Sequence, residues 1–246
     1  MRFERDYFVH YYDSDLKRKA TISGIMRYFE DIAILHSEYV NIGIDYYINH
    51  HVVWMLYKWD IKIKRLPSFM ETIKVRTVPT SLKSFHAFRY FDILDEDGDR
   101  IVTANSMWLF INTNTKKPIK ITDDMFEGYG IHPDDMAELE IGEIGSFENT
   151  DSSKEFFIRY SDIDTNKHVN NIKYIDWALE AVPEDLLQNY SLTRVIVNYK
   201  KEIGYGSRIV SSASVERGQN TAKCVHRITS GESELCVLET HWCISG

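Results

Sequence analysis

The chain contains two copies of one sequence pattern, and an internal repeat constrains its fold more than any local signal. Tyr12-Asp13-Ser14-Asp15 resembles Ser161-Asp162-Ile163-Asp164, and Asp162 follows Asp13 by 149 positions. Further pairs at the same offset are Thr21 with Asn170, Met26 with Ile175, Tyr28 with Trp177, and Asp31 with Glu180. The 246 residues therefore form two related halves.

An apolar stripe at helical spacing follows the Asp-x-Asp unit in each half. The stripe consists of Ile22, Ile25, Met26, Phe29, Ile32 and Ala33 in the first half, and of Ile172, Ile175, Leu179 and Val182 in the second. Each stripe predicts a long buried helix. Gly43 is the expected end of the first helix, because glycine favours the backbone conformation that follows many helices.

Segments rich in β-branched and aromatic residues follow both predicted helices. They cover residues 52–63, 71–78, 84–94 and 100–112 in the first half, and 194–200 and 231–244 in the second. Trp108 matches Trp242 in the last segment of each half, and residues 95–98 have the composition of a hairpin turn. One helix wrapped by an antiparallel sheet, present twice, is an α+β arrangement.

Residues from about 112 to 148 show no periodic pattern and contain two prolines and four glycines. We interpret this stretch as the connection between the halves. The predicted organisation is an N-terminal half at 1–125, a linker at 126–148 and a C-terminal half at 149–246.

A row of polar residues precedes the second predicted helix. Asp162, Asp164, Asn166 and His168 alternate with other residues, so an extended backbone would place all four on one side. The N-terminus of a helix, where N–H groups and the positive end of the dipole collect, can stabilise negative charge on a carbonyl oxygen. The alternative is structural: Asp and Asn are ordinary helix caps, and an isolated His often only donates a hydrogen bond.

The two copies differ at the polar row. Lys17 takes the place of Asn166, Lys19 that of His168, and, at an offset of 137, Arg65 that of Glu202. Asp13 and Asp15 survive in the first copy, which favours a structural role for Asp162 and weakens a catalytic one for Asp164. This difference predicts a single active site built mainly by the second half, with the first half shaping the substrate pocket.

Composition excludes several classes of protein. The net charge of −8 argues against general nucleic-acid binding, and no apolar run is long enough to span a membrane. The acidic residues near the N-terminus do not suit a signal or transit peptide, so we expect a cytoplasmic protein. No glycine-rich phosphate loop and no Gly-x-Ser-x-Gly elbow are present, so no cofactor and no serine hydrolase are expected.

The cysteines give no sign of a disulfide framework or a metal site. Their number is odd, and Cys224, Cys236 and Cys243 all lie near the end of the chain, so we expect free thiols. Cys236, His241 and Cys243 lack a second ligand pair at metal-site spacing and fall in a predicted strand. We therefore expect no metal.

The segment from Asp162 to Trp177, Asp-x-Asp-x-Asn-x-His-Val-Asn-Asn-x-x-Tyr-x-x-Trp, resembles the second half of the acyl-acyl-carrier-protein thioesterases. This family includes plant plastid enzymes and bacterial relatives, and the chain looks like the bacterial form. The resemblance covers essentially the whole chain, since these proteins have two fused hotdog folds. It implies a tandem double hotdog, with each half an antiparallel sheet around a long central helix.

The resemblance also implies an activity: hydrolysis of the thioester of fatty acyl-acyl carrier protein, which releases free fatty acid and terminates chain elongation. The family's catalytic Asp, Asn, His and Glu correspond to Asp164, Asn166, His168 and Glu202. In the plant enzymes a Cys follows this Glu, but here the next residue is Ile203. This departure favours direct attack by water, without an acyl-enzyme.

The division of proton transfer stays open at this stage. Glu202 is a candidate general base, with a pKa that burial could raise, and His168 could share this task or orient the water. Asp164 would fix the geometry of the row. Backbone N–H groups near Val169 and Asn170 are candidates for binding the oxyanion.

Three other functions compete with this reading. An acyl-CoA thioesterase of the same fold would differ only in its carrier, and a non-catalytic acyl-binding hotdog protein would release no thiol. A hotdog dehydratase would need an acid–base pair for which no element is visible. The expected partner is acyl carrier protein bearing a fatty acyl chain, and two fused hotdogs allow either a monomer or a homodimer.

Overall fold

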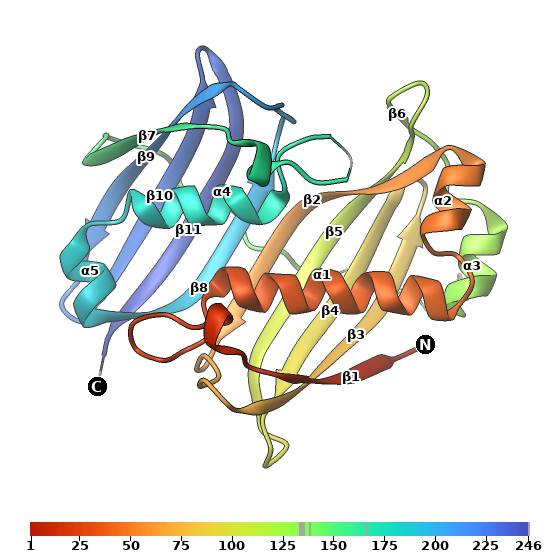
Figure 1. The fold of residues 1–246 in the computed structure, drawn as a ribbon, viewed down its shortest axis with the longest axis horizontal. Coiled ribbons are helices and arrows are strands. Elements are labelled where there is room, and N and C mark those ends of the chain that lie inside the picture. The colour runs from red at the N-terminus through yellow and green to blue at the C-terminus, as the bar shows by residue number, and fades with distance from the viewer. Residues whose placement is uncertain (133–135, 138, 166, 246) are drawn as a thin grey trace. The chain divides into compact units, whose positions relative to one another are not determined.

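A computed structural model describes residues 1–132, 136–137, 139–165 and 167–245 (Figure 1). The chain forms two compact units. The first comprises residues 1–58 and 64–141, and the second residues 59–63 and 142–246. The second unit is therefore discontinuous in sequence. The domain boundaries inferred from the sequence, 1–125 and 149–246, stay predictions.

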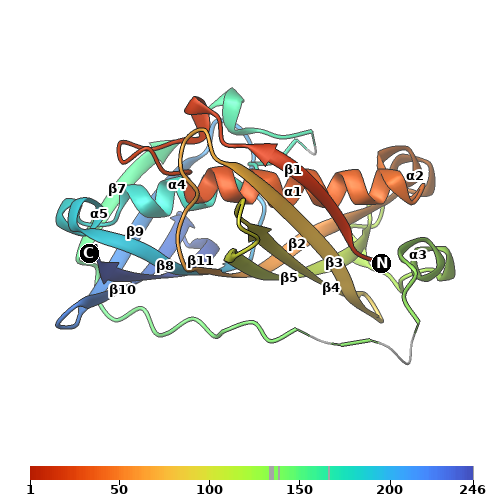
Figure 2. The ribbon, with the colours of Figure 1, turned by 90° about the horizontal axis from the view of Figure 1, so that it is seen from below.

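The first unit consists of antiparallel strands with a long helix on one face of their sheet (Figure 2). Its strands β1 (Phe3–Phe8), β2 (Val52–Ile63), β3 (Thr72–Lys83), β4 (His86–Leu94) and β5 (Arg100–Asn112) lie in the order β1-β3-β4-β5-β2. The short strand β6 (Lys117–Pro118) pairs with β5, and β1–β3, β3–β4 and β4–β5 pair antiparallel. The predicted strands at 52–63 and 100–112 and the turn at 95–98 are confirmed, the turn by the positive φ of Gly98.

Helix α1 (Ile22–Tyr39) carries the predicted apolar stripe, and Ile25, Met26, Phe29 and Ile32 are fully buried. Burial of each such side chain stabilises the fold by about 1.5–3 kcal/mol. The Thr21 side chain caps the start by accepting the N–H of Gly24 at 3.0 Å.

The expected end of this helix at Gly43 is wrong. Asn41 takes the left-handed conformation (φ 59°), and Asn41 N and Ile42 N donate to the carbonyls of Glu38 and Ser37. Asparagine tolerates this conformation, so the helix stops before the glycine is reached. Gly43 instead precedes the short helix α2 (Ile44–His50).

The second unit repeats the arrangement. Strands β7 (Ser152–Phe157), β8 (Tyr190–Tyr199), β9 (Arg208–Arg217), β10 (Thr221–Ser230) and β11 (Ser233–Ile244) lie in the order β8-β11-β10-β9-β7. Helix α4 (Asn171–Glu180) packs on this sheet and is followed by α5 (Glu184–Asn189). The α+β double-hotdog prediction is confirmed, although Val182 lies beyond the end of α4.

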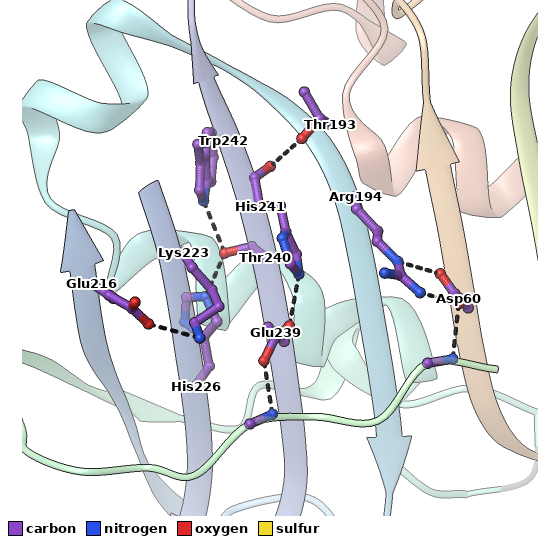
Figure 3. Close-up of polar contacts among 12 residues, drawn as sticks. Asp60, Thr193, Arg194, Glu216, Lys223, His226, Glu239, Thr240, His241 and Trp242 are labelled. Carbon is purple, nitrogen blue, oxygen red and sulfur yellow. Dashed lines mark hydrogen bonds and ion pairs between the residues drawn. The ribbon is translucent and has the colours of Figure 1, made fainter. Parts of the chain in front are cut away.

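Equivalent hydrogen bonds confirm the repeat. Trp108 Nε1 donates to Ser106 Oγ at 2.7 Å, and Trp242 Nε1 donates to Thr240 Oγ1 at 2.9 Å. In both cases the acceptor lies two residues earlier on the same strand. Thr240 Oγ1 also lies 2.9 Å from Nε2 of His226, which is completely buried (Figure 3).

The segment that enters the second unit lies along its sheet on the face opposite α4 (Figure 2). Two buried carboxylates hold it (Figure 3). Asp60 accepts the N–H of Gly142 at 2.9 Å and is paired with Arg194, and Glu239 accepts the N–H of Gly145 at 2.8 Å. A Cβ on Gly142 would lie 2.4 Å from Arg194 Nη2, so a glycine permits this close approach. The expectation that residues 112–148 are irregular is wrong at α3 (Asp123–Tyr129), a helix of the first unit.

Candidate active site

The polar row is a tight loop rather than an extended strand. A short 3₁₀ helix, Tyr160–Asp162, comes first, and the loop then closes through Asp164 N to His168 O (2.9 Å) and Lys167 N to Asp164 O (3.1 Å). Lys167 has a positive φ of 64°. The prediction of an extended segment is therefore wrong for Asp162, Asp164 and His168.

Asp162 has a structural role. Its buried carboxylate accepts the backbone N–H of Arg159 at 2.8 Å and is held by the Arg159 guanidinium. Burial acts to raise the pKa of Asp162, but the hydrogen bonds from Arg159 outweigh it and hold the pKa below its ordinary value. Its counterpart Asp13 is likewise buried and bonded to Tyr28, as its survival in the first copy suggested.

His168 and Glu202 come together although 34 residues separate them in sequence. His168 Nδ1 lies 3.3 Å from Glu202 Oε2, and the two side chains are 35% and 52% exposed. The loop that carries Glu202 is fixed to the helix entry, because Val169 N donates to Ile203 O at 3.1 Å. The burial assumed for Glu202 is therefore wrong, but its proximity to the histidine is real.

The neighbouring lysines do not neutralise Glu202. Lys200 Nζ pairs with Glu234, and Lys201 Nζ donates to Ser233 Oγ at 3.0 Å. A solvent-exposed ion pair with either lysine was the structural alternative for this carboxylate. Glu202 contacts His168 instead.

The predicted oxyanion donors are already occupied. Val169 N donates to Ile203 O, and Asn170 N donates to Asp162 O at 2.9 Å. The Asn170 side chain caps α4 by accepting the N–H of Ile172 at 2.9 Å. The N–H groups of Val169 and Asn170 both donate to backbone carbonyls. Their assignment to the oxyanion is therefore wrong.

Two predicted residues remain, Asp164 and Asn166. Asp164 shapes it through the backbone bonds described above. Asn166 lies outside the described residues. The first copy gives a parallel for the aspartate: Asp15 Oδ1 accepts the N–H groups of Lys17 (2.8 Å) and Lys19 (2.9 Å).

The first copy keeps the backbone bonds of the loop but lacks the His–Glu pair. Asp15 N bonds to Lys19 O, and Ala20 N to Pro67 O, as Asp164 N and Val169 N do in the second copy. Lys19 Nζ donates to Ser68 Oγ at 2.8 Å instead of facing a carboxylate.

These bonds also correct the internal alignment at Glu202. Lys64 N and Arg65 N both approach Ile101 O, as Lys200 N and Lys201 N approach Leu235 O. Arg65 is thus the counterpart of Lys201, and Leu66 is the counterpart of Glu202. A one-residue shift between strand ends is invisible to sequence comparison when the side chains differ. The conclusion that the first copy lacks the carboxylate holds.

Three aromatic residues lie on the segments that carry this pair; Tyr174 belongs to the quoted sequence motif, and reasoning from the sequence missed Tyr160 and Tyr205. Tyr174 of α4 is buried, and burial, with Cys236 and Glu202 contributing, raises its pKa. Tyr160 and Tyr205 form an edge-on pair 6.2 Å apart and are 83% and 67% exposed. The signal that could have found Tyr160 and Tyr205 was their position in the sequence, near His168 and near Glu202.

Among the described residues, no three or more His, Cys, Asp or Glu side chains gather in a way that could hold a metal ion. No helix of the described chain is long and apolar enough to cross a membrane. All three cysteines are free, with Cys224 and Cys236 buried and Cys243 exposed.

Two hotdog units in one chain, with a His–Glu pair at the helix entry of the second, define a tandem hotdog protein. The family models for the acyl-ACP thioesterase N-terminal and C-terminal domains match residues 1–129 and 146–243. The chain belongs to the acyl-ACP thioesterase family.

Individual relatives agree with this assignment. The dodecanoyl-[acyl-carrier-protein] hydrolase of Cinnamomum camphora is 25% identical over 98% of this chain and 67% of its own length. For the oleoyl-acyl carrier protein thioesterase of Coriandrum sativum the identity is 23%, over 90% of this chain and 65% of its own length. Both are chloroplastic proteins, and this chain spans only about two thirds of their length.

Solved structures share the fold over nearly their whole length. The putative oleoyl thioesterase of Lactobacillus plantarum superimposes with a TM-score of 0.93 at 23% identity, covering 100% of this chain and 97% of that one. An acyl-ACP thioesterase of Bacteroides thetaiotaomicron gives 0.84 at 22% identity, covering 98% and 97%.

Proposed function

We propose that this protein hydrolyses the thioester of fatty acyl-acyl carrier protein, releasing free fatty acid and terminating chain elongation. The observation that carries the proposal is the 3.3 Å approach of His168 Nδ1 to Glu202 at the entry of α4. The curated relatives act on acyl groups carried by acyl carrier protein, and family membership supports the same substrate class here.

His168 is the proposed general base. With Nδ1 turned to Glu202, the other ring nitrogen, Nε2, accepts a proton from water as the water attacks the thioester carbonyl. Glu202 positions the imidazole and stabilises the imidazolium that forms. As the C–S bond breaks, the imidazolium gives this proton to the leaving thiolate, and the fatty acid is released. Glu202 then acts through His168. This proposal revises the expectation from the sequence that Glu202 itself is the general base.

Direct attack by water requires that no protein thiol compete as nucleophile. Ile203 follows Glu202, so no thiol stands there. Cys224 and Cys236 are buried, and burial raises the pKa of both thiols, that of Cys224 to about 11. Thiolates react far more readily than thiols, so these residues suit a structural role.

Oxyanion stabilisation falls to the Asn166 carboxamide, which the family pattern assigns to the site, and to the N-terminal dipole of α4. Asp164 has a positioning role, because it shapes the loop through its backbone bonds as Asp15 shapes the loop of the first copy. The site then contains one base, one carboxylate behind it and one neutral donor. No cofactor is needed for this chemistry.

The proposed partner is acyl carrier protein, the proposed compartment is the cytoplasm, and the proposed assembly is a monomer or homodimer. Tyr160 and Tyr205 form an exposed aromatic pair on the two segments that carry His168 and Glu202, and we assign this surface to the carrier's prosthetic arm. An acyl-CoA thioesterase remains the alternative with the same chemistry.

The test is free-thiol release from matched C8 to C18 acyl-carrier-protein and acyl-CoA panels. We expect hydrolysis that prefers the carrier protein and that His168→Ala abolishes. Lys19→Ala is the matched control, because it changes the same position of the first copy. No release from either panel by folded protein would sink the proposal and favour acyl binding without catalysis.

A pair of variants separates the base from its partner. Glu202→Gln should lower kcat by about 10²-fold or less, and His168→Ala by about 10²–10⁴-fold. Glu202→Gln should also shift the pH dependence of kcat, since it removes the charge that favours the imidazolium. A larger loss in Glu202→Gln than in His168→Ala would return the base to Glu202.

A further inference from the structure

The loop of the first copy, which lacks the His–Glu pair, carries exposed apolar residues instead. It lies between β1 and α1 (Figure 1) and closes as a tight turn, with Arg18 N donating to Asp15 O at 3.0 Å and Asp15 N to Lys19 O at 2.8 Å. Leu16 and Lys17 are the two central residues of this turn. The Leu16 side chain is fully exposed, so it projects from the turn into solvent.

Met70 is a second exposed apolar residue, on the loop beside this turn. Phe69 N donates to Arg18 O at 2.9 Å, which holds the two loops together. Met70 is 64% exposed, and its φ of 70° is a backbone conformation that favours glycine. A large side chain that is strained in place and adds little to the protein's own core suits a role in binding.

Comparison of the two copies shows that the repeat does not require these side chains. At three exposed positions of the first copy a large apolar or aromatic residue replaces a small or polar one: Tyr12 for Ser161, Leu16 for Thr165 and Met70 for Gly206. The first two pairs follow the offset of 149. The third follows the backbone, because Met70 N donates to Val9 O at 3.0 Å and Gly206 N donates to Ile158 O, the equivalent carbonyl, at 3.2 Å.

Aromatic contacts hold the neighbouring rings in place. Tyr11 meets Phe69 edge-on with ring centroids 5.9 Å apart, and Tyr12 stacks on His10 at 5.0 Å. Phe8 also contacts the His10 ring, at 5.4 Å. The exposed apolar and aromatic residues of the two loops, which we call the apolar tip, are Phe8, Tyr11, Tyr12, Leu16 and Met70.

The turn is also locally basic, although the whole chain has a net charge of −8. Three consecutive basic residues follow Leu16: Lys17, Arg18 and Lys19. Asp15 is the only acidic residue between positions 14 and 20. Glu71, on the neighbouring loop, is neutralised by Arg65, whose guanidinium donates to both carboxylate oxygens at 3.1 and 2.9 Å.

Projecting apolar side chains beside basic ones match the chemistry of an anionic lipid surface. Such a surface attracts Lys and Arg, and its headgroup region accepts leucine and aromatic side chains. A protein partner matches less well, because the residues that dominate protein interfaces fill enclosed, well-packed pockets. Leu16, by contrast, extends from a turn.

We propose that the apolar tip inserts into the headgroup region of an anionic membrane, with Lys17 and Arg18 against the lipid phosphates. The first unit then binds membranes reversibly. Every residue of this surface belongs to the first unit. The inference does not rest on the proposed function.

The test is sedimentation of the full chain with lipid vesicles. The vesicles contain phosphatidylcholine alone, or phosphatidylcholine and phosphatidylglycerol in equal parts. We expect partitioning about tenfold stronger onto the mixed vesicles at low salt, since each basic residue near an anionic surface contributes about fivefold. High salt should remove this preference. Equal partitioning onto both kinds of vesicle, or none onto either, would overturn the proposal.

Three substitutions give the apolar tip the residues of the second copy: Tyr12→Ser, Leu16→Thr and Met70→Gly. Leu16→Thr should weaken partitioning about tenfold, because the leucine side chain no longer leaves water. Met70→Gly should weaken it without lowering Tm, since glycine adopts the positive φ more readily. Ile48→Thr, at an exposed apolar position of α2, is the matched control and should bind as wild type. Full binding by the triple variant refutes the site.

Charge variants test the basic residues separately. Lys17→Gln combined with Arg18→Gln should remove the preference for phosphatidylglycerol. Lys116→Gln combined with Lys117→Gln changes two other exposed lysines of the first unit and should keep it. Equal losses in the two double variants would mean that the turn is not the site of attraction.

His168→Ala separates this inference from the proposed function, because it should bind vesicles as wild type and lose hydrolysis. A chain that hydrolyses acyl-carrier-protein thioesters and ignores vesicles refutes the inference alone. A chain that binds vesicles and releases no thiol refutes the proposed function alone. If the chain ignores vesicles and the triple variant dissociates a dimer in sedimentation velocity, the apolar tip contacts a second copy and the membrane proposal fails.

Discussion

His226 should make the second unit acid-labile. Its imidazole is completely buried, and burial lowers its pKa from 6.5 to about 4. In the unfolded chain the same group has its ordinary pKa. The unfolded state therefore binds a proton near pH 6.5, whereas the folded state resists protonation until about pH 4. Stability is complete above pH 6.5 and falls as the pH drops toward 4.

The size of the effect follows from the two pKa values. Between about pH 7.5 and pH 5.0 the linkage contributes a loss of roughly 2 kcal/mol, and about 3 kcal/mol once the pH is below 4. Wild-type protein will lose more than this, because His36 is a second buried histidine with a lowered pKa. The difference between wild type and a variant isolates the part that belongs to His226.

The assay is urea unfolding at the two pH values for wild type and His226→Gln. Glutamine keeps a donor for Thr240 Oγ1 and does not titrate. The loss of unfolding free energy on acidification should be smaller in the variant by roughly 2 kcal/mol. His132→Gln, at an exposed histidine, should behave as wild type. If wild type and His226→Gln lose the same stability, the assignment of acid lability to this residue is refuted.

Two further predictions concern stability and thiol chemistry. Asp162→Ala should lower the free energy of unfolding by about 1–3 kcal/mol, because the Arg159 N–H loses its acceptor; a thermal melt within error of wild type would contradict this. In the folded protein one thiol, Cys243, should react with a thiol-specific disulfide reagent, and Cys224 and Cys236 should react only after denaturation; three fast thiols would contradict their burial.

The elements that could be predicted from the sequence are those set by local composition. The segments at 52–63 and 100–112 are runs of β-branched and aromatic residues flanked by turn formers, and β2 and β5 have the same bounds. Their pattern and their final geometry agree because both depend on the same alternation of side chains. The end of α1 was predicted wrongly because Asn41 takes the left-handed conformation, which sequence patterns assign first to glycine.

The site was predicted in composition but not in geometry. Alternation suggested an extended row, but a 3₁₀ turn and the positive φ of Lys167 fold it into a loop. The matching φ of Arg18 in the first copy shows that this loop belongs to the repeat itself. Pattern reasoning could not find the His168–Glu202 contact, because it depends on how the loop at 200–207 is fixed to the helix entry.

The second unit borrows residues 59–63 from the first half of the chain, and Asp60 among them holds both Arg194 and Gly142. A fragment that starts at residue 142 would carry the whole candidate site and still lack this acceptor. During synthesis the borrowed stretch leaves the ribosome long before its partners exist. The two halves, although they are copies of one pattern, have thus become inseparable: neither can be excised, shuffled or expressed alone without breaking the ion pair between Asp60 and Arg194.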